Sequence, residues 1–409
     1  FVRDAPFLPN AHRLGTATST VKPWPHQQRV ADLVVERFPE GFLLSDEVCL
    51  GKTIEAGLAL RQLLLAGRVK RCLILTPKSV TRQWQEELYE KFVLNIPRYD
   101  GKMFFDVFDR ELSSDDDNPW NSFPVFIASS QLAKRKDRQP ELLAAKPWDL
   151  VLVDEAHHAR RKDFLQLERY RPNRLLGLLN ALRDKTRGLL LLTATPMQIH
   201  PVEVWDLLHL LGIGGKWGAG EENFLRFFEE VRKPAFSEVD WPFVLQMVRD
   251  ELEHGGGLDP TFASEVLRQL GPVEWQQIQG LPWAKDPLPH IRALSEKGQA
   301  VLVELVRRHT PLRRLAQRNT RSLLRKYQER GILKDTVPKR DPKPEWILFR
   351  DEERNLYERI EEYISDFYNK YESERKGLGF IMTVYRRRLT SSFYAIQRSL
   401  ERRLAFLEG

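Results

Sequence analysis

The sequence predicts an α/β protein, with a doubly wound parallel sheet followed by an all-helical region. Between residues 41 and 212, short and continuously apolar runs alternate with helical patterns. Runs of this length, bounded by turns, are typical of strands buried in a parallel sheet. After residue 212 the alternation stops, and helical patterns separated by glycine and proline take its place.

Five apolar runs are expected to form the strands: Phe42–Ser45, Cys72–Thr76, Val125–Ser129, Leu150–Asp154 and Leu189–Thr193. One helix between them should span Lys52–Ala66 and end at Gly67, because glycine commonly follows a helix. Another helix should begin near Ser79 and place Trp84, Leu88 and Phe92 on its inner face.

The later part of the chain should contain five helices, followed by a linker, a short strand at Glu345–Phe349 and a long helix. The five predicted helices are Glu222–Glu230, Pro242–Glu253, Pro260–Gln269, Leu288–Arg308 and Leu312–Arg330. Composition and pattern divide the chain into residues 1–40, 41–212, 213–335 and 336–409.

The bulk composition excludes several classes of protein. A chain of 409 residues with 42% hydrophobic and 30% charged residues is typical of a globular protein with two or three domains. No apolar run is long enough to cross a bilayer, so no membrane association is expected. Two cysteines form no disulfide framework, which favours the reducing cytoplasm. The opening FVRDAPFLPN lacks an initiator Met, so we expect a longer natural product.

The net charge of +7 favours a polyanionic partner. The stretch LRRLAQRNTRSLLRK (Leu312–Lys326) carries six basic residues and no acidic one, and a second basic cluster occupies Tyr385–Arg388. A solvated helix face is the plain alternative for each cluster. A track for a phosphate backbone is favoured if a nucleotide site lies upstream.

The stretch LLSDEVCLGKT (Leu43–Thr53) ends as a phosphate-binding loop ends, with Gly-Lys-Thr opening a helix. Such a loop directs backbone N–H groups and a positive helix end at phosphates. Lys52 should contact the outer phosphates of ATP, and the Thr53 hydroxyl should bind Mg²⁺. A strand–turn–helix with an incidental Gly-Lys-Thr is the alternative. The expected nucleotide-binding residues are Asp46, Glu47, Val48, Cys49, Leu50, Gly51, Lys52 and Thr53.

A second motif is VLVDEAHH (Val151–His158), an apolar strand that ends in two carboxylates. Asp154 suits Mg²⁺ because hard cations take oxygen ligands. Glu155 suits the base that orients a water molecule on the terminal phosphate. Lys52, Asp154 and Glu155 are therefore the expected catalytic residues. A charged strand terminus is the alternative, and zinc is disfavoured because no further His/Cys cluster accompanies the two histidines.

A third motif is LLLLTATPMQ (Leu189–Gln198), in which a buried strand delivers Thr193 and Thr195 to the sheet edge. These hydroxyls can couple the carboxylates at the nucleotide site, Asp154 and Glu155, to a neighbouring surface of the protein. A strand ending in threonine is unremarkable alone. All three motifs, however, follow strands of one predicted sheet, and ligands of open α/β sheets bind at the carboxyl ends of strands. The order of the motifs therefore favours a nucleotide site.

These motifs resemble the first motor lobe of helicase superfamily two, in its Swi/Snf-type DNA translocase branch and its HepA/RapA-like group. PHQQRVADLVV (Pro25–Val35) resembles the nucleotide-recognition segment of that group, which implies that Gln27 reads adenine. SDEVCLGKTIEAG resembles its phosphate loop, where an acidic residue such as Asp46 is expected. Further resemblance lies in LTPKSVTRQWQEEL, VDEAHHAR, LTATPMQ, QRNTRSLLRK and YRRRLTSSFYAIQRSL, so that nearly the whole chain is covered.

The resemblance implies an ATP hydrolase that uses ATP and Mg²⁺ to translocate along double-stranded DNA without obligatory strand separation. It assigns residues 1–40 to an N-terminal nucleotide-recognition segment and 41–212 to a RecA-like lobe. Residues 213–335 become a helical insertion, and 336–409 a linker with the incomplete opening of a second lobe. Backbone contacts to DNA are expected from Ser79, Gln83, Ser129 and Ser130. Arg318 and Arg321 either contact DNA or hold the helical region in place.

Two departures from the family pattern carry consequences. Cys49 stands where the group has glycine, and the cost of its Cβ in a left-handed loop should weaken nucleotide binding about tenfold. Nothing after Phe349 resembles the late motifs of the second lobe, which carry arginines that complete the ATP site, so weak ATP hydrolysis by this chain alone is expected. The alternatives are a strand-separating helicase, a recycling motor for RNA polymerase, and a binding scaffold without turnover. The modules by which a polymerase recycler grips its partner are not visible before Pro23, which favours anti-phage defence, with partners in a multi-subunit system, or another DNA transaction.

Overall fold

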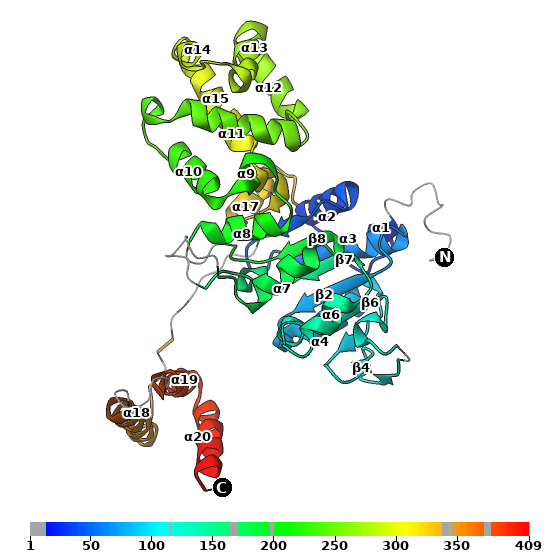
Figure 1. Cartoon of the computed structure of the whole chain (residues 1–409), viewed down its shortest axis with the longest axis vertical. Coiled ribbons are helices and arrows are strands. Elements are labelled where there is room, and N and C mark those ends of the chain that lie inside the picture. The colour runs from blue at the N-terminus through cyan, green and yellow to red at the C-terminus, as the bar shows by residue number, and fades with distance from the viewer. Residues whose placement is uncertain are drawn as a thin grey trace. The chain divides into compact units, whose positions relative to one another are not determined.

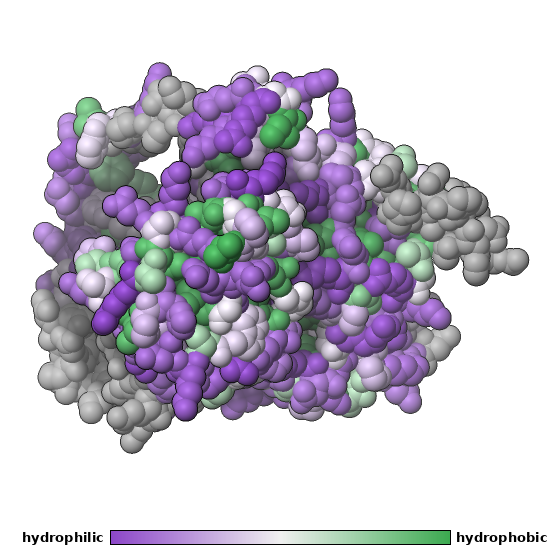
Figure 2. All heavy atoms as spheres, turned by 90° about the horizontal axis from the view of Figure 1, so that it is seen from above, coloured by the Kyte–Doolittle hydropathy of each residue, from purple (hydrophilic) through white to green (hydrophobic). Residues whose placement is uncertain are grey.

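The computed structural model of the chain describes residues 14–114, 116–162, 171–196, 200–337, 343, 345–346, 348–371 and 378–408 (Figure 1). The chain divides into two compact units, Phe1–Val337 and Pro338–Gly409. No described helix is long and apolar enough to cross a membrane. Hydrophilic residues predominate on the face seen in Figure 2, with hydrophobic residues scattered among them.

In the described part of the first unit, nine strands form one sheet in the order β5-β4-β3-β6-β2-β7-β8-β1-β9. Neighbouring strands are parallel except for the pairs β3–β4 and β4–β5. The predicted parallel α/β sheet is thereby confirmed. The strands are β1 (Phe42–Leu44), β2 (Cys72–Thr76), β3 (Arg98–Tyr99), β4 (Phe104–Phe105), β5 (Glu111–Leu112), β6 (Val125–Ser129), β7 (Trp148–Val153), β8 (Thr186–Leu192) and β9 (Ala316–Gln317).

Helices cover both faces of the sheet, which is the reason its central strands β1, β2, β6, β7 and β8 consist mostly of apolar residues. In β1, Phe42 and Leu44 face one core while Leu43 between them faces the other, and all three side chains are fully buried. The first core contains α2 (Pro25–Arg37), α3 (Lys52–Leu65) and α4 (Thr81–Phe92). The second contains α5 (Ser130–Ala133), α6 (Gln139–Ala144), α7 (Arg174–Arg183) and α8 (Val202–Leu210). A short helix, α1 (Leu14–Ala17), packs on α3.

The helices after α8 enclose a separate core of buried aromatic and aliphatic side chains, including Trp217, Phe227, Val244 and Leu302. Helices α11, α12, α13 and α15 gather together in Figure 1. This part of the chain consists of α9 (Gly215–Ala219), α10 (Glu221–Val231), α11 (Trp241–His254), α12 (Pro260–Leu270), α13 (Pro272–Gly280), α14 (Leu288–Arg292), α15 (Glu296–Arg308), α16 (Pro311–Leu315) and α17 (Arg321–Glu329).

Two predicted helices are wrong in this region. The helix predicted at Leu288–Arg308 is two helices, because the Ser295 side chain accepts a hydrogen bond from Gly298 N and starts α15 afresh. The helix predicted at Leu312–Arg330 is interrupted by β9, which pairs with β1, and α17 starts behind the Thr320 cap. The region is therefore not all-helical. A strand of two residues is too short to leave a periodic pattern in the sequence.

The second unit contains three helices, α18 (Asp351–Tyr371), α19 (Leu378–Ser391) and α20 (Phe393–Glu408). They share a small core of Ile364, Met382, Leu389 and Ile396. The strand predicted at Glu345–Phe349 is wrong for residues 345, 346, 348 and 349, which lie in no strand. Residue 347 lies outside the described residues.

Candidate functional site

The three motifs lie next to one another at the carboxyl edge of the sheet. β8 lies between β1 and β7 and runs parallel to both. Each strand ends one residue earlier than predicted, so Ser45, Asp154 and Thr193 are the first residues beyond β1, β7 and β8. Thr193 N donates a hydrogen bond to Leu44 O at 2.9 Å, which aligns two of these ends. Gln198, the last residue of the third motif, lies outside the described residues.

The phosphate loop between β1 and α3 contains two residues in the left-handed conformation, Cys49 (φ 65°) and Gly51 (φ 93°). Position 51 needs glycine because of its left-handed φ, and also because a Cβ there would lie 2.2 Å from Gln27 Nε2. Lys52 Nζ donates to the backbone oxygens of Asp46 at 2.8 Å and Glu47 at 3.5 Å. The ammonium group is thus held on the concave side of its own loop.

Gln27 is buried between the start of α2 and the loop. Its Oε1 accepts from Trp24 N and its Nε2 donates to Leu50 O, each at 2.9 Å. The side chain therefore joins the nucleotide-recognition segment to the phosphate loop. Its role as an adenine reader stays a prediction.

Asp154 is held by two hydrogen-bond donors. Trp84 Nε1 donates to its Oδ2 at 2.8 Å, and Glu155 N donates to its Oδ1 at 2.9 Å. Burial raises the pKa of Asp154, and the hydrogen bond from Trp84 opposes that rise. Sequence analysis placed Trp84 only on the inner face of a helix and missed this contact. The contact could have been suspected from the residue type, because a buried indole N–H usually has a hydrogen-bond acceptor.

Glu155 has a left-handed backbone (φ 50°) and precedes a 3₁₀ turn, Ala156–His158. His157 Nδ1 lies 3.1 Å from Glu155 Oε2 and 2.9 Å from Thr193 Oγ1. The hydrogen bond from His157 lowers the pKa of Glu155, so this carboxylate is ionised at neutral pH. Thr195 N donates to Thr193 Oγ1 at 3.1 Å. His157 Nδ1 therefore lies within hydrogen-bond distance of both Glu155 and Thr193, and the Thr193 hydroxyl also accepts from Thr195.

The donor set at this edge fits a magnesium ion. Thr53 offers a hydroxyl on the first turn of α3 and Asp154 a carboxylate at the end of β7, and hard cations prefer such oxygens. The positive charge of Lys52 acts on both carboxyls: it opposes the rise in the pKa of Asp154 that burial causes, and it adds to the lowering of the pKa of Glu155 by His157. The ammonium therefore lies within electrostatic range of both carboxylates.

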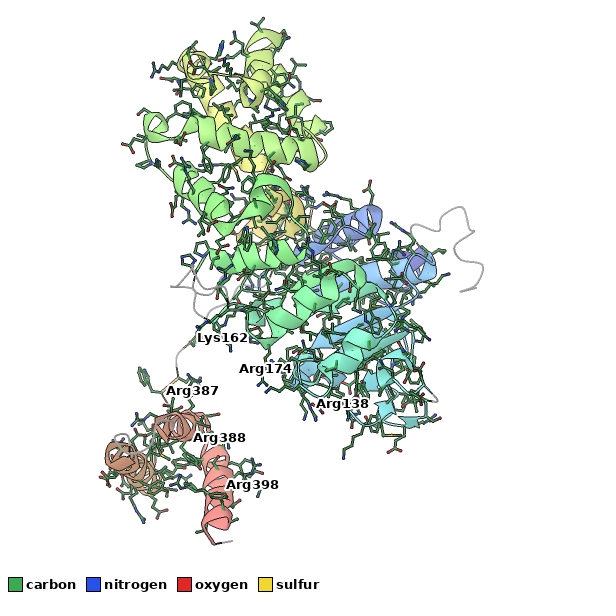
Figure 3. All side chains as sticks on the ribbon, in the orientation of Figure 1. Arg138, Lys162, Arg174, Arg387, Arg388 and Arg398 are labelled. Carbon is green, nitrogen blue, oxygen red and sulfur yellow. The ribbon has the colours of Figure 1, made fainter. Side chains whose placement is uncertain are left out.

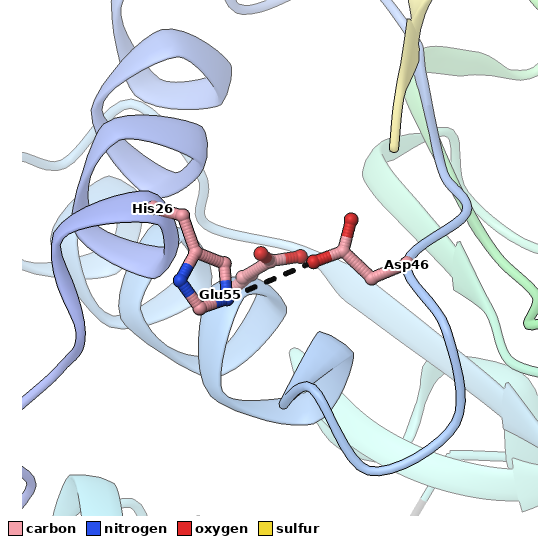
Figure 4. A group of neighbouring side chains, drawn as sticks. All are labelled: His26, Asp46 and Glu55. Carbon is pink, nitrogen blue, oxygen red and sulfur yellow. Dashed lines mark ion pairs between the residues drawn. The ribbon is translucent and has the colours of Figure 1, made fainter. Parts of the chain in front are cut away.

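A further carboxyl group, that of Glu55, lies beside Asp46 and His26 near the phosphate loop (Figure 4). His26 Nε2 lies 3.9 Å from Asp46 Oδ2. Burial, reinforced by the charge of Asp46, raises the pKa of Glu55 well above its usual range. Burial therefore favours the protonated form of Glu55, which lies close to the Asp46 carboxylate.

The residues expected to contact DNA follow β2 and β6, which are neighbours in the sheet. Ser79 and Gln83 are exposed at the start of α4. Ser129 and Ser130 are largely buried, and Ser129 Oγ accepts from Leu132 N at 3.1 Å as the cap of α5. Ser79 and Gln83 are therefore accessible to DNA, whereas Ser129 caps the N-terminus of α5.

Arg318 and Arg321, which either contact DNA or hold the helical region in place, differ in their surroundings. Arg318 is exposed. Arg321 Nη1 donates to Glu47 Oε2 at 3.3 Å and its Nη2 to Val48 O at 2.6 Å. These contacts favour the holding role for Arg321. Figure 3 marks further basic side chains, including Arg138 and Arg174 on the first unit and Arg387, Arg388 and Arg398 on the second.

Residues 26–392 match the SNF2-related domain family. The SWI2/SNF2 ATPase core of Sulfolobus solfataricus in complex with dsDNA is similar at 14% identity over 90% of this chain and 57% of that chain, with a TM-score of 0.40. The Sulfolobus solfataricus SWI2/SNF2 ATPase core domain is similar at 18% identity over 54% of this chain and 41% of that chain, with a TM-score of 0.39.

The chain thus spans about half the length of the solved chains it matches. The family match, by contrast, extends over most of this chain and includes all three motifs. The chain therefore belongs to the SNF2-related domain family and carries a Swi/Snf-type motor domain of helicase superfamily two, as its motifs predict.

Proposed function

We propose that this chain is the ATP-binding part of a DNA-dependent ATPase that translocates along double-stranded DNA. The convergence of Lys52, Asp154 and Glu155 at one sheet edge supports this function. Lys52 would contact the outer phosphates of ATP, and Thr53 and Asp154 would hold a magnesium ion, which when bound would supply positive charge against the phosphates.

Glu155 orients the attacking water and accepts its proton. Its lowered pKa keeps it ionised, and ionisation is the state that a base requires. His157 links this carboxylate to Thr193, so that a change at the nucleotide reaches the loop after β8. Thr193 and Thr195 are accordingly the coupling residues.

Double-stranded DNA contacts the same edge one strand further along. Ser79 and Gln83 are free of burial at the start of α4, where hydroxyl and amide groups can position phosphates. Trp84 follows in the same helix and donates to Asp154. Helix α4, which carries Gln83 and directly follows the 3₁₀ turn with Ser79, therefore connects the DNA contacts to the magnesium carboxylate, which supports DNA dependence.

ATP turnover with and without duplex DNA tests the proposal. Glu155→Gln should retain Mg²⁺–ATP binding and lose at least about a hundredfold in turnover, because an amide cannot accept the proton. Glu265→Gln, an exposed glutamate on α12, is the matched control and should change neither. Equal turnover in Glu155→Gln and wild type would contradict the assignment of the base.

Displacement of a third strand from a triplex, compared with unwinding of a tailed duplex, separates translocation from strand separation. Triplex displacement without unwinding supports the proposal, and unwinding would favour a helicase. ATP binding without any turnover by the full-length protein would favour a scaffold, the alternative that Cys49 suggests. A role in anti-phage defence or polymerase recycling, the protein partners and the cytoplasmic location stay predictions from the sequence.

A further inference from the structure

The phosphate loop is bound along its length by a distant part of the chain, the segment Ala316–Leu324, which we name the clasp. The backbone makes the first contacts. β9 extends the sheet beyond β1, with Ala316 opposite Leu43. Ser45 N then donates to Gln317 O at 2.8 Å, and the next rung follows two residues later in each segment, where Glu47 N donates to Asn319 O at 3.1 Å. The clasp therefore continues the sheet ladder into the loop.

The strongest side-chain contact joins Asp46 to Asn319. Asp46 Oδ1 accepts from the backbone N of Asn319 at 2.6 Å and from its Nδ2 at 3.1 Å, and Oδ2 accepts from the same Nδ2 at 3.0 Å. The two side chains are 0% and 2% exposed. Hydrogen bonds to a buried charged acceptor are stronger than those between neutral groups. This contact thus anchors the first residue of the loop motif.

Two further contacts hold the middle and the end of the loop. Arg321 donates from its backbone N and its guanidinium to Glu47 Oε2, and from Nη2 to Val48 O. Leu50 is buried in a small cluster with Leu324 of the clasp. Every loop residue from Ser45 to Leu50 except Cys49 therefore has a contact with the clasp in the described structure.

We propose that the clasp positions the phosphate loop for nucleotide and that Asn319 is its main positioning residue. The inference rests on the proposed function, because the loop is taken to hold ATP. Asn319 fixes Asp46, and the backbone oxygen of Asp46 accepts from Lys52 Nζ at 2.8 Å. The clasp thereby sets the position of the lysine. It also explains why an aspartate replaces the first glycine of the general loop pattern, since its carboxylate serves the clasp rather than the phosphates.

The position of the clasp in the chain gives this contact a further consequence. Asn319 follows directly after the helices α9–α16, so the nucleotide loop and the helical region share one segment. A partner that binds the helical region and shifts the clasp changes nucleotide affinity. By reciprocity, bound nucleotide restrains the clasp.

The test combines amide hydrogen exchange with nucleotide binding. Asn319→Ala should accelerate exchange in residues 44–52 without nucleotide, and should weaken binding of a fluorescent Mg²⁺–ATP analogue by roughly tenfold or more. Asn223→Ala is the matched control, because this asparagine donates one exposed hydrogen bond to Lys216 O far from the loop. It should leave both measurements unchanged. Arg321→Gln, a milder change at a partly exposed site, should shift both in the same direction by less.

A swap of the two groups distinguishes positioning from general support of the fold. Asn319→Asp alone sets a second carboxylate against Asp46 and should bind nucleotide more weakly than Asn319→Ala. Asp46→Asn combined with Asn319→Asp restores a carboxylate–amide pair and should recover part of the affinity. Unchanged loop exchange in Asn319→Ala, or acceleration spread evenly over the first unit, would overturn the clasp. Failure of the wild type to bind nucleotide would instead refute the proposed function, while the exchange comparison still decides the clasp.

Discussion

Cys49 combines a side chain with a backbone conformation that favours glycine. Its φ of 65° places it in the left-handed region, and its side chain is exposed. Sequence analysis attached a cost to this cysteine and placed that cost on nucleotide binding. The left-handed conformation belongs to the folded loop itself, so we expect its cost to fall on folding.

The size of the effect follows from two opposing terms. A Cβ in the left-handed region costs about 1–2 kcal/mol. Glycine removes that cost but adds roughly 0.4–1 kcal/mol of conformational entropy to the unfolded chain. Cys49→Gly should therefore stabilise the first unit by about 0.5–1 kcal/mol net. This corresponds to a rise in melting temperature of roughly 1 °C for a unit of this size.

The assay is thermal unfolding, with titration of a fluorescent Mg²⁺–ATP analogue. Cys49→Ala keeps the Cβ and removes the thiol, so it should leave the melting temperature unchanged. Val93→Gly relieves a second left-handed residue (φ 54°) at the end of α4, and its side chain is 58% exposed. It should raise the melting temperature without touching the loop. Cys49→Gly itself should change nucleotide affinity by no more than about twofold, equivalent to about 0.4 kcal/mol.

Two results would refute this reasoning. An equal gain in melting temperature for Cys49→Ala and Cys49→Gly would assign the effect to the thiol rather than to the Cβ. A tenfold gain in affinity for the glycine variant, with no change in melting temperature, would mean that the strain arises on nucleotide binding. That outcome would restore the expectation drawn from the sequence.

Two further predictions concern buried polar groups. Trp84→Phe keeps the aromatic packing but removes the hydrogen bond to Asp154, so ATP turnover should fall about tenfold. Trp120→Phe is the control, because the buried Trp120 indole N–H has no hydrogen-bond partner among the described residues. Equal turnover in the two variants would contradict the role of Trp84. Burial lowers the pKa of His309 from its ordinary value of 6.5, so the unfolded chain takes up the proton first and the helical region should lose stability as pH falls below about 6.5. Melting temperatures between pH 7.5 and 5.5 should decline less steeply in His309→Asn than in wild type, whereas an unchanged slope would mean that His309 is not the group that titrates.

The sequence alone was enough to predict five of the nine described strands and the place where the motifs meet. Strands buried on both faces are mostly apolar, so β1, β2, β6, β7 and β8 could be recognised as short apolar runs. The carboxyl ends of parallel strands share one edge, and this rule alone brings Lys52, Asp154 and Thr193 together. The family pattern added the roles of these residues, which remain proposals.

Only the tertiary structure decided how the side chains at that edge are held. The contact between Asp46 and Asn319 joins residues 273 positions apart, and no local pattern encodes such a pair. β9 was predicted as helix because two residues in a strand carry no period, and pairing with β1 outweighed the helical propensity around them. The direction of the Arg321 guanidinium toward Glu47, rather than toward solvent, likewise depended on where the chain returns after the helical region. Periodicity reports which face of an element is buried, whereas long-range packing fixes which polar groups meet.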